Sequence, residues 1–259
     1  MKNPLKIIIV IPSRMGSSRF PGKPLFEIIG LPMIEHVRRR SLLANCASDV
    51  IVATCDQEII DTVTAFGGRA IMTLDTHERC TDRIEEAVTG IDADIIVNVQ
   101  GDEPLLDPEV IDKLVAPFYK DNSVLCTNIV HPITDKSELS SKNVVKVVLS
   151  HTNKIIYLSR SEIPGTMLET NITYYKQSGI MAFKKEFLHE FSKLTAGPLE
   201  KKESIDMLRV LENDYGIQGV VSHGETVGVD VKENIDFVVK TLETGKQKAL
   251  WDKIKEIKI

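Results

Sequence analysis

Short apolar segments rich in β-branched residues recur along the first half of the chain and alternate with amphipathic segments. The apolar segments are Lys6–Ile11, Val50–Thr54, Ala70–Met72 and Ile95–Val99. The segments between them, Met33–Leu43, Gln57–Phe66 and Thr81–Val88, place apolar residues three and four positions apart, which is typical of amphipathic helices. Because uniformly apolar strands suit a sheet covered on both faces, this alternation predicts a parallel α/β sheet with right-handed crossovers.

The second half of the chain follows a less regular pattern. We expect strands at Val124–Val130, Val144–Ser150 and Ile155–Ser159, and Gly219–Ser222 leading into a further strand. The middle two of these segments can form a hairpin through residues 151–153, so mixed or antiparallel pairing is expected here. Helices are predicted at residues 203–212 and, as one charged amphipathic C-terminal helix, at residues 234–257.

Composition and charge indicate one main globular domain and narrow the range of partners. Of 259 residues, 42% are hydrophobic and 27% are charged, and the net charge is −5. An acidic chain lacks the positive field that holds a polymeric nucleic acid, although a local basic cluster can still bind a small polyanion. The four cysteines are widely spaced, which excludes a zinc site of the CxxC type. The apolar run Ile7–Ile11 is too short for a signal peptide or a membrane span, so we expect a cytoplasmic protein without membrane association.

A basic, glycine-containing loop follows the first predicted strand, at residues 12–25. Its glycines let the backbone approach an oxyanion, and its cations provide charge-assisted contacts to phosphate oxygens. The candidate side chains and backbone groups are Ser13, Arg14, Gly16, Arg19 and Lys23. The loop lies where ligands bind in open α/β sheets, at the carboxyl end of a strand. The spacing of its glycines and lysine fits neither a P-loop nor a dinucleotide-binding motif. The alternative to an anion-binding site is that the loop is a solvated basic turn.

Two aspartates are candidate metal ligands. Asp102 follows the buried strand Ile95–Val99, which places its carboxylate at the same sheet edge as the basic loop, and Asp230 is the second candidate. Mg²⁺ prefers oxygen ligands and is commonly shared between one or two carboxylates and substrate phosphates. The alternative for both residues is a turn-forming or helix-capping role. Gln100, just before Asp102, can reach ribose or sugar hydroxyls.

Residues 14–25, RMGSSRFPGKPL, resemble the signature loop of the sugar nucleotidyltransferases, most closely that of the 3-deoxy-manno-octulosonate (Kdo) cytidylyltransferases. The likeness continues in the family's order at residues 31–37, 52–54, 66–68, 97–104, 144–148 and 228–230. It implies an α/β, Rossmann-like nucleotidyltransferase fold with a mostly parallel central sheet flanked by helices, and a smaller mixed α+β subdomain. It also implies one domain over residues 1–259: a CTP-binding half (about 1–125), a sugar-acid-binding and dimerisation half (about 126–225), and a returning metal-ligand segment with the C-terminal helix (about 226–259).

The resemblance implies an enzyme that transfers CMP from CTP to Kdo, or to an analogue such as 8-amino-Kdo, and releases pyrophosphate. Arg14 and Lys23 would bind the triphosphate, and Asp102 and Asp230 would hold Mg²⁺. A homodimer and a place in lipopolysaccharide biosynthesis are also implied. Three alternatives remain: a cytidylyltransferase for another acid such as a nonulosonate or a phosphonate, a related enzyme that uses another NTP, and a non-catalytic nucleotide-binding regulator.

The segment that the family uses to select cytosine departs from the family pattern. Thr81 and Arg83 fit it, but Cys80 stands where the family usually has glycine and Arg79 replaces a serine. Cys80, Thr81 and Arg83 are therefore candidate base-binding residues. A nucleophilic role for Cys80 beside His77 is the alternative from a different class of chemistry, and a small packing residue is the simplest interpretation.

Further departures fall in the part of the chain that would bind the sugar acid. The candidate residues there are Arg160, Gln177 and Asp206. Arg160 can pair with a carboxylate, while Gln177 stands where the family often has histidine and Asp206 where it has glutamate. Two interpretations remain open: the enzyme accepts a different 3-deoxy-ulosonic acid, or the pocket has drifted and Kdo is still preferred.

Overall fold

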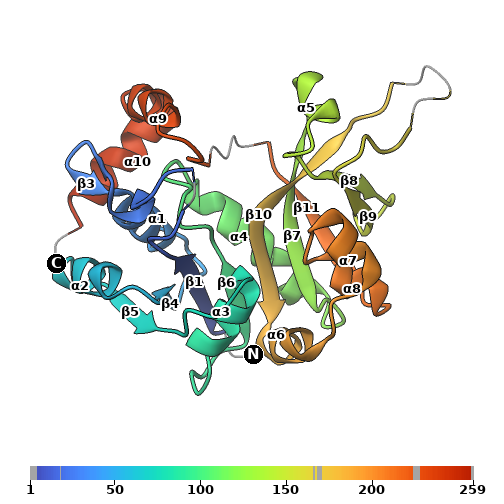
Figure 1. The fold of residues 1–259 in the computed structure, drawn as a ribbon, viewed down its shortest axis with the longest axis horizontal. Coiled ribbons are helices and arrows are strands. Elements are labelled where there is room, and N and C mark those ends of the chain that lie inside the picture. Colours follow the sequence, from blue (N-terminus) through green and yellow to red (C-terminus); the bar gives the residue numbers. More distant parts are fainter. Residues whose placement is uncertain (1–4, 18, 166, 168–170, 224–227, 258–259) are drawn as a thin grey trace. The chain divides into compact units, whose positions relative to one another are not determined.

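The computed structural model describes residues 5–17, 19–165, 167, 171–223 and 228–257 (Figure 1). The chain forms two compact units: the first comprises Met1–Asp112 with Thr226–Ile259, and the second comprises Lys113–Glu225. The C-terminal segment thus returns to the first unit after the chain has completed the second. In the part of the chain that the structure describes, no helix is long and apolar enough to cross a membrane.

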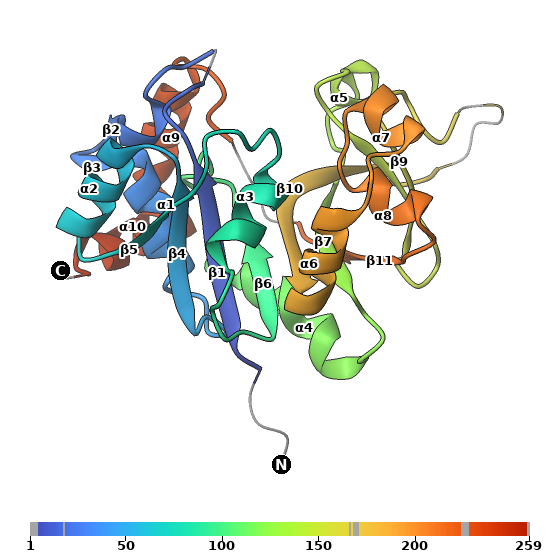
Figure 2. The same cartoon turned by 60° about the horizontal axis from the view of Figure 1, so that its bottom comes forward.

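The first unit is built on a parallel sheet. Its strands are β1 (Ile7–Ser13), β4 (Asp49–Thr54), β5 (Arg69–Met72) and β6 (Ile95–Asn98), in the order β6-β1-β4-β5. All three pairings are parallel, and every residue of β1 is buried. The helices between the strands are α1 (Met33–Ser41), α2 (Gln57–Ala65) and α3 (Cys80–Ala87), which Figure 2 shows beside the sheet. The predicted α/β fold with a mostly parallel sheet flanked by helices is confirmed.

The elements between β1 and α1 are short. A 3₁₀ turn, η1 (Lys23–Leu25), is followed by a small antiparallel hairpin of β2 (Glu27–Ile28) and β3 (Leu31–Pro32). Gly22, which precedes η1, has a φ of 72°, a conformation that costs glycine little and other residues more. The glycine therefore lets the basic loop turn sharply just before Lys23.

Helix α1 is buried on every side, charged residues included. The guanidinium of Arg38 donates to both carboxylate oxygens of Glu35, at 2.6 and 2.7 Å, and Arg39 donates to the same carboxylate at 3.2 Å. Arg39 also donates to the carbonyl of Ile254, and Arg40 to the side chain of Gln247. A buried charge is tolerated only when it is paired and hydrogen-bonded, and here the C-terminal segment supplies part of that bonding. These contacts tie the returning segment to the first unit.

His36 in α1 makes the stability of the protein depend on pH. Its Nε2 donates to the carbonyl of Ile28 at 2.8 Å, its ring stacks on Trp251, and its Nδ1 faces no partner among the described residues. Burial, helped by the nearby charges of Arg40 and Arg39, lowers the pKa of His36 from 6.5 to about 4. The unfolded chain therefore binds the proton first, so stability is retained above pH 6.5 and lost as the pH falls toward 4.

We expect His36→Gln to flatten this pH dependence. Between pH 7 and pH 5 the wild type should lose about 2 kcal/mol of folding free energy through this residue, and the variant should not lose that part. Thermal unfolding across this range measures it, with His151→Gln on an exposed turn as the control. A variant that follows the wild-type slope would show that His36 is not the titrating group.

The C-terminal helix predicted at residues 234–257 is in fact two helices, α9 (Asn234–Leu242) and α10 (Gly245–Lys255). Between them Thr244 is extended (φ −128°, ψ 150°) and Gly245 is left-handed (φ 48°), so the helical hydrogen bonds are interrupted. The break lets both helices bury apolar side chains, among them Leu242 and Ile254. The prediction of one helix was wrong because the amphipathic pattern does not show where a glycine turns the chain.

The second unit contains a mixed sheet. Its strands are β7 (Cys126–Pro132), β8 (Lys146–Leu149), β9 (Ile155–Ser159), β10 (Tyr175–Lys184) and β11 (Ile217–Val221). Strand β10 is antiparallel to β7 and β8, β8 and β9 form the predicted hairpin, and β11 is parallel to β7. The predictions of mixed pairing and of the hairpin are confirmed. Strand β10 was not predicted, because its first half is polar.

The second unit contains more helices than the one predicted at residues 203–212. They are α5 (Ser137–Ser140), α6 (Lys185–Lys193), α7 (Pro198–Glu203) and α8 (Leu208–Glu212), and α4 (Pro108–Lys120) runs from the first unit into the second. The helix predicted at residues 203–212 is confirmed only over α8, because α7 ends at Glu203 and the next residue, Ser204, adopts a φ of 53°. Arg160 stabilises this end: its Nε donates to the carbonyl of Glu203 at 2.7 Å and its Nη2 to that of Ser204 at 3.2 Å.

Candidate functional site

A pocket of about 310 Å³ opens in the first unit where β1 and β6 end. It is lined by Pro12, Ser13, Arg14, Gly16, Ser17, Arg19, Lys23, Pro24, His77, Glu78, Arg79, Cys80, Arg83, Gln100, Gly101, Asp102 and Asp230. The pocket therefore brings together the basic loop, the loop after β6, the start of α3 and the returning C-terminal segment. Carboxyl ends of parallel strands are the usual ligand site of open α/β sheets.

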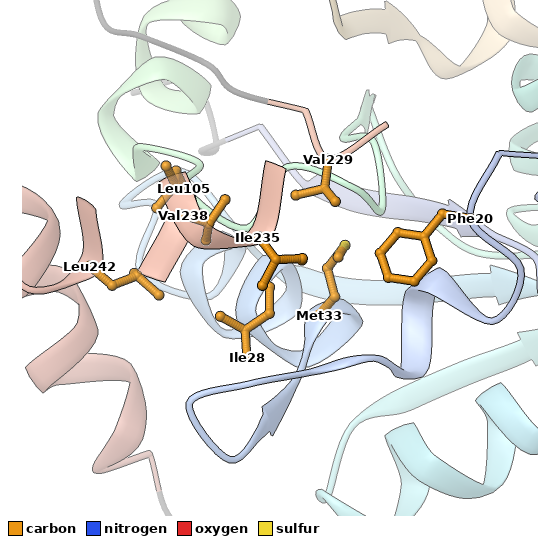
Figure 3. Close-up of a cluster of buried hydrophobic side chains, with 8 residues drawn as sticks. All are labelled: Phe20, Ile28, Met33, Leu105, Val229, Ile235, Val238 and Leu242. Carbon is orange, nitrogen blue, oxygen red and sulfur yellow. The ribbon is translucent and has the colours of Figure 1, made fainter. Parts of the chain in front are cut away.

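An apolar cluster joins the segments that carry the charged side chains of the pocket (Figure 3). Phe20 comes from the basic loop, Leu105 from the loop after β6, and Val229 from the returning segment. The cluster consists of Phe20, Ile28, Met33, Leu105, Val229, Ile235, Val238 and Leu242. Each of the three charged segments thus has a buried apolar residue close in sequence to its charged residues. The packing of these apolar residues fixes the relative positions of the charged side chains.

Lys23 and Asp102 form the innermost ion pair of the pocket. The ammonium of Lys23 donates to Oδ2 of Asp102 at 2.7 Å and to the carbonyl of Val229 at 2.7 Å. The amide of Val229 donates to the carbonyl of Asp102 at 2.8 Å, so three separate segments are hydrogen-bonded at one point. Only 12% of the Lys23 side chain and 31% of the Asp102 side chain are exposed, which makes this pair stronger than a pair on the open surface.

Arg19 and Asp230 form a second, more open ion pair. Nη2 of Arg19 lies 2.8 Å from Oδ1 of Asp230, and more than half of each side chain is exposed. The amide of Asp230 is held by the side chain of Asn234 at 3.0 Å. Asp230 does not cap α9, because the residue at the cap position is Glu233 and no side chain caps that helix. Both candidate metal carboxylates therefore face cations of the basic loop.

The donor set fits Mg²⁺ bound together with a polyphosphate. Among the described residues no group of three or more metal-binding side chains gathers. The carboxylates that line the pocket are Asp102, Asp230 and Glu78, and the first two face cations of the basic loop. Mg²⁺ commonly takes one or two protein carboxylates and completes its shell with water and substrate phosphates. Arg14, also at the pocket, is exposed and makes no hydrogen bond or ion pair to another residue of the described chain. The pocket thus combines metal-binding oxygens with an available cation for phosphate.

Two acidic residues beside the pocket were missed by the sequence interpretation. Asp56 follows β4 and accepts a hydrogen bond from the amide of Met15 at 2.8 Å, which holds the basic loop; its position after a strand at the same sheet edge was the available signal. Glu103 is buried, and burial together with the charge of Asp102 raises the pKa of its carboxyl to about 8. With this pKa Glu103 is largely protonated at neutral pH, so Asp102 carries the negative charge of this loop.

The predicted base-binding residues divide into two groups. Cys80 and Gln100 line the pocket, where the thiol of Cys80 lies 3.8 Å from Oε1 of Gln100. Cys80 is exposed, so its interpretation as a small packing residue is wrong. Arg83 reaches the pocket but is largely buried, and its guanidinium donates to Thr73. Thr81 is buried and is not part of the pocket lining, and its predicted role stays a prediction.

His77 and Cys80 do not form a nucleophilic pair. The Nε2 of His77 is hydrogen-bonded to the carboxylate of Glu86 on α3. This ring nitrogen therefore faces Glu86 and not the thiol of Cys80. The basic loop supplies the remaining predicted contacts, since Ser13, Gly16 and Arg19 all line the pocket. Ser18 of the same loop lies outside the described residues.

The predicted sugar-acid residues all lie in the second unit. The guanidinium of Arg160 donates to the carbonyls of Lys142, Glu203 and Ser204, which uses three of its five N–H groups within the protein. Gln177 lies on β10 and donates to Asn128, and the half-buried Asp206 lies between α7 and α8. Carboxylate binding by Arg160 stays a prediction.

Comparisons with known proteins show which family the chain resembles. The family model described as cytidylyltransferase matches residues 8–220. A 3-deoxy-manno-octulosonate cytidylyltransferase of Geobacter metallireducens is 43% identical over 92% of this chain and 98% of its own length. One of Syntrophus aciditrophicus is 42% identical over 89% of this chain and 94% of its own length.

Solved structures give the same result. The structure of a CMP:2-keto-3-deoxy-manno-octonic acid synthetase complexed with CTP is 36% identical, with a TM-score of 0.88 over 92% of this chain and 98% of that one. A cytidylyltransferase of Leptospira borgpetersenii shares the fold at 17% identity, with a TM-score of 0.63 over 97% of this chain and 94% of that one. The chain therefore belongs to the family of the 3-deoxy-manno-octulosonate cytidylyltransferases.

Proposed function

We propose that this protein transfers CMP from CTP to 3-deoxy-manno-octulosonate and releases pyrophosphate. The observation that supports it most is the pocket in which Lys23 meets Asp102 and Arg19 meets Asp230. A non-catalytic nucleotide-binding regulator has no need for two carboxylates beside the phosphate-binding cations. The named relatives act on the same sugar acid, which favours Kdo over a nonulosonate or a phosphonate.

In this mechanism the protein binds and orients two anionic substrates. Arg14 and Lys23 contact the triphosphate and stabilise the charge that develops on its oxygens as the anomeric hydroxyl of the sugar acid attacks the α-phosphorus. Asp102 and Asp230 would hold Mg²⁺, which neutralises charge on the triphosphate and on the leaving pyrophosphate. Cys80, Arg83 and Gln100 form the part of the pocket that faces the nucleoside.

The acceptor side belongs to the second unit. We assign Gln177 and Asp206 to sugar-acid binding, in line with the division into a CTP-binding half and an acceptor half. A homodimer, a cytoplasmic location and a place in lipopolysaccharide biosynthesis stay predictions.

Pyrophosphate release tests this function directly. With CTP and Mg²⁺ we expect turnover of Kdo at least about tenfold more efficient than that of a nonulosonate or a phosphonate, because a missing hydrogen-bond partner costs a polar site at least that much. UTP and GTP in place of CTP are the nucleotide controls. A preference for another acid would move the assignment to that acceptor, and the absence of pyrophosphate with every acid would remove the enzymatic assignment.

A further inference from the structure

Strand β10 carries a bulge opposite β7 in the second unit. Gln177 pairs with Val130 and Met181 pairs with Asn128, so residues 178–180 of β10 face only Ile129 of β7. An irregularity of this kind leaves backbone groups without their ladder partners, and those groups require partners elsewhere. Bulges recur beside functional sites because they re-aim a side chain.

Asn128 fills this bulge with its side-chain amide. Its Nδ2 donates to the carbonyl of Ser178 at 2.9 Å and to that of Ile180 at 3.0 Å, and the residue is completely buried. Carbonyl oxygens only accept hydrogen bonds, so the nitrogen of the amide must face the bulge. The oxygen of Asn128 must then face the opposite way.

The orientation of Asn128 fixes that of Gln177. Oδ1 of Asn128 accepts a hydrogen bond from Nε2 of Gln177 at 2.7 Å, and an oxygen at this place can be approached only by a donor. The carbonyl oxygen of Gln177 is therefore turned away from Asn128. The Gln177 side chain is partly exposed, and its Oε1 has no hydrogen-bond partner among the residues that the structure describes.

We propose that Asn128 is a positioning residue for acceptor recognition, because it compels Gln177 to present a hydrogen-bond acceptor to the sugar acid. This inference rests on the proposed function, in which Gln177 binds the acceptor. A fixed carbonyl oxygen favours a substrate with a hydroxyl or ammonium hydrogen at that point and disfavours one that offers only a lone pair. Asn128 lies outside every segment that carries the family resemblance.

Substituting the two residues singly and together tests the proposal. Gln177→Leu is expected to raise KM for Kdo about tenfold while KM for CTP changes less than about twofold, because one hydrogen bond to the acceptor is lost. Asn128→Ala should change the same KM in the same direction. The double variant should be no worse than Gln177→Leu alone, since Asn128 acts through Gln177. Gln218→Leu on β11, whose amide bonds only to backbone carbonyls of Thr152 and Gly219, is the matched control.

Kdo analogues that each lack one hydroxyl provide a second measurement. With the wild type, kcat/KM for one analogue should be about tenfold lower than for Kdo. With Gln177→Leu, kcat/KM for that analogue and for Kdo should be equal, a result that a purely structural role would not produce. If Asn128→Ala does not fold, this comparison alone decides. An unchanged KM for Kdo in Gln177→Leu overturns the inference, whereas a wild-type protein that does not use Kdo at all overturns the proposed function.

Discussion

Asp102→Asn is expected to lower kcat for pyrophosphate release about a thousandfold and to leave the protein folded. The amide has nearly the shape of the carboxylate but carries no charge, so it would bind Mg²⁺ poorly and would no longer pair with Lys23. The fold should survive because the hydrogen bond from the amide of Val229 ends on the backbone carbonyl of Asp102, which the substitution keeps. Steady-state pyrophosphate release with CTP, Kdo and Mg²⁺ measures the rate, and thermal unfolding measures the stability.

A second aspartate in the same unit serves as the control for this loss. Asp107 forms an ion pair with Lys246 and does not line the pocket, so Asp107→Asn removes a charge of the same kind from outside the site. This control should retain at least about half of the wild-type rate, because partly exposed ion pairs contribute little. Near-normal turnover by Asp102→Asn would show that the carboxylate has no part in the chemistry.

The sequence was most informative where one physical requirement dominated. Strands β1, β4 and β6 are almost entirely buried, so each reads as a short apolar run. These three strands and the more exposed β5 were all predicted close to their observed bounds. The basic loop and Asp102 follow two of these strands. Their meeting in one pocket could be anticipated because the carboxyl ends of parallel strands share an edge of the sheet.

Features that depend on contacts between distant segments were not visible in the sequence. The end of α7 at Glu203, at the start of the helix predicted for residues 203–212, is stabilised by Arg160, which is about forty positions away and donates to the carbonyls of Glu203 and Ser204. The polar start of β10 is held by Asn128 on β7, a partner that no periodicity reveals. Asp230 was a candidate metal ligand from the sequence, but its place beside the basic loop depends on Val229 packing into the apolar cluster.

Lys23→Met is expected to reduce kcat/KM for CTP about a thousandfold, with a loss of CTP affinity as part of it. Methionine keeps most of the length and apolar volume of the lysine, which suits a side chain that is only 12% exposed, but it removes the ammonium that faces the triphosphate in the proposed mechanism. Calorimetric titration with CTP separates the binding loss from the kinetic loss. Lys246→Met, which breaks the ion pairs to Asp107 and Glu109 outside the pocket, is the matched control.

The same variant should respond to Mg²⁺ in a way that distinguishes a phosphate-binding lysine from a structural one. In the wild type the charge of Lys23 opposes a cation approaching Asp102, because the two groups are 2.7 Å apart. Without the ammonium, Asp102 is free of its cation, and Mg²⁺ should bind in the absence of CTP several-fold more tightly than to the wild type. A Lys23→Met protein with weaker CTP binding and unchanged Mg²⁺ binding would mean that Lys23 contacts the triphosphate without shielding Asp102. Unchanged CTP binding and turnover would instead remove Lys23 from the site altogether.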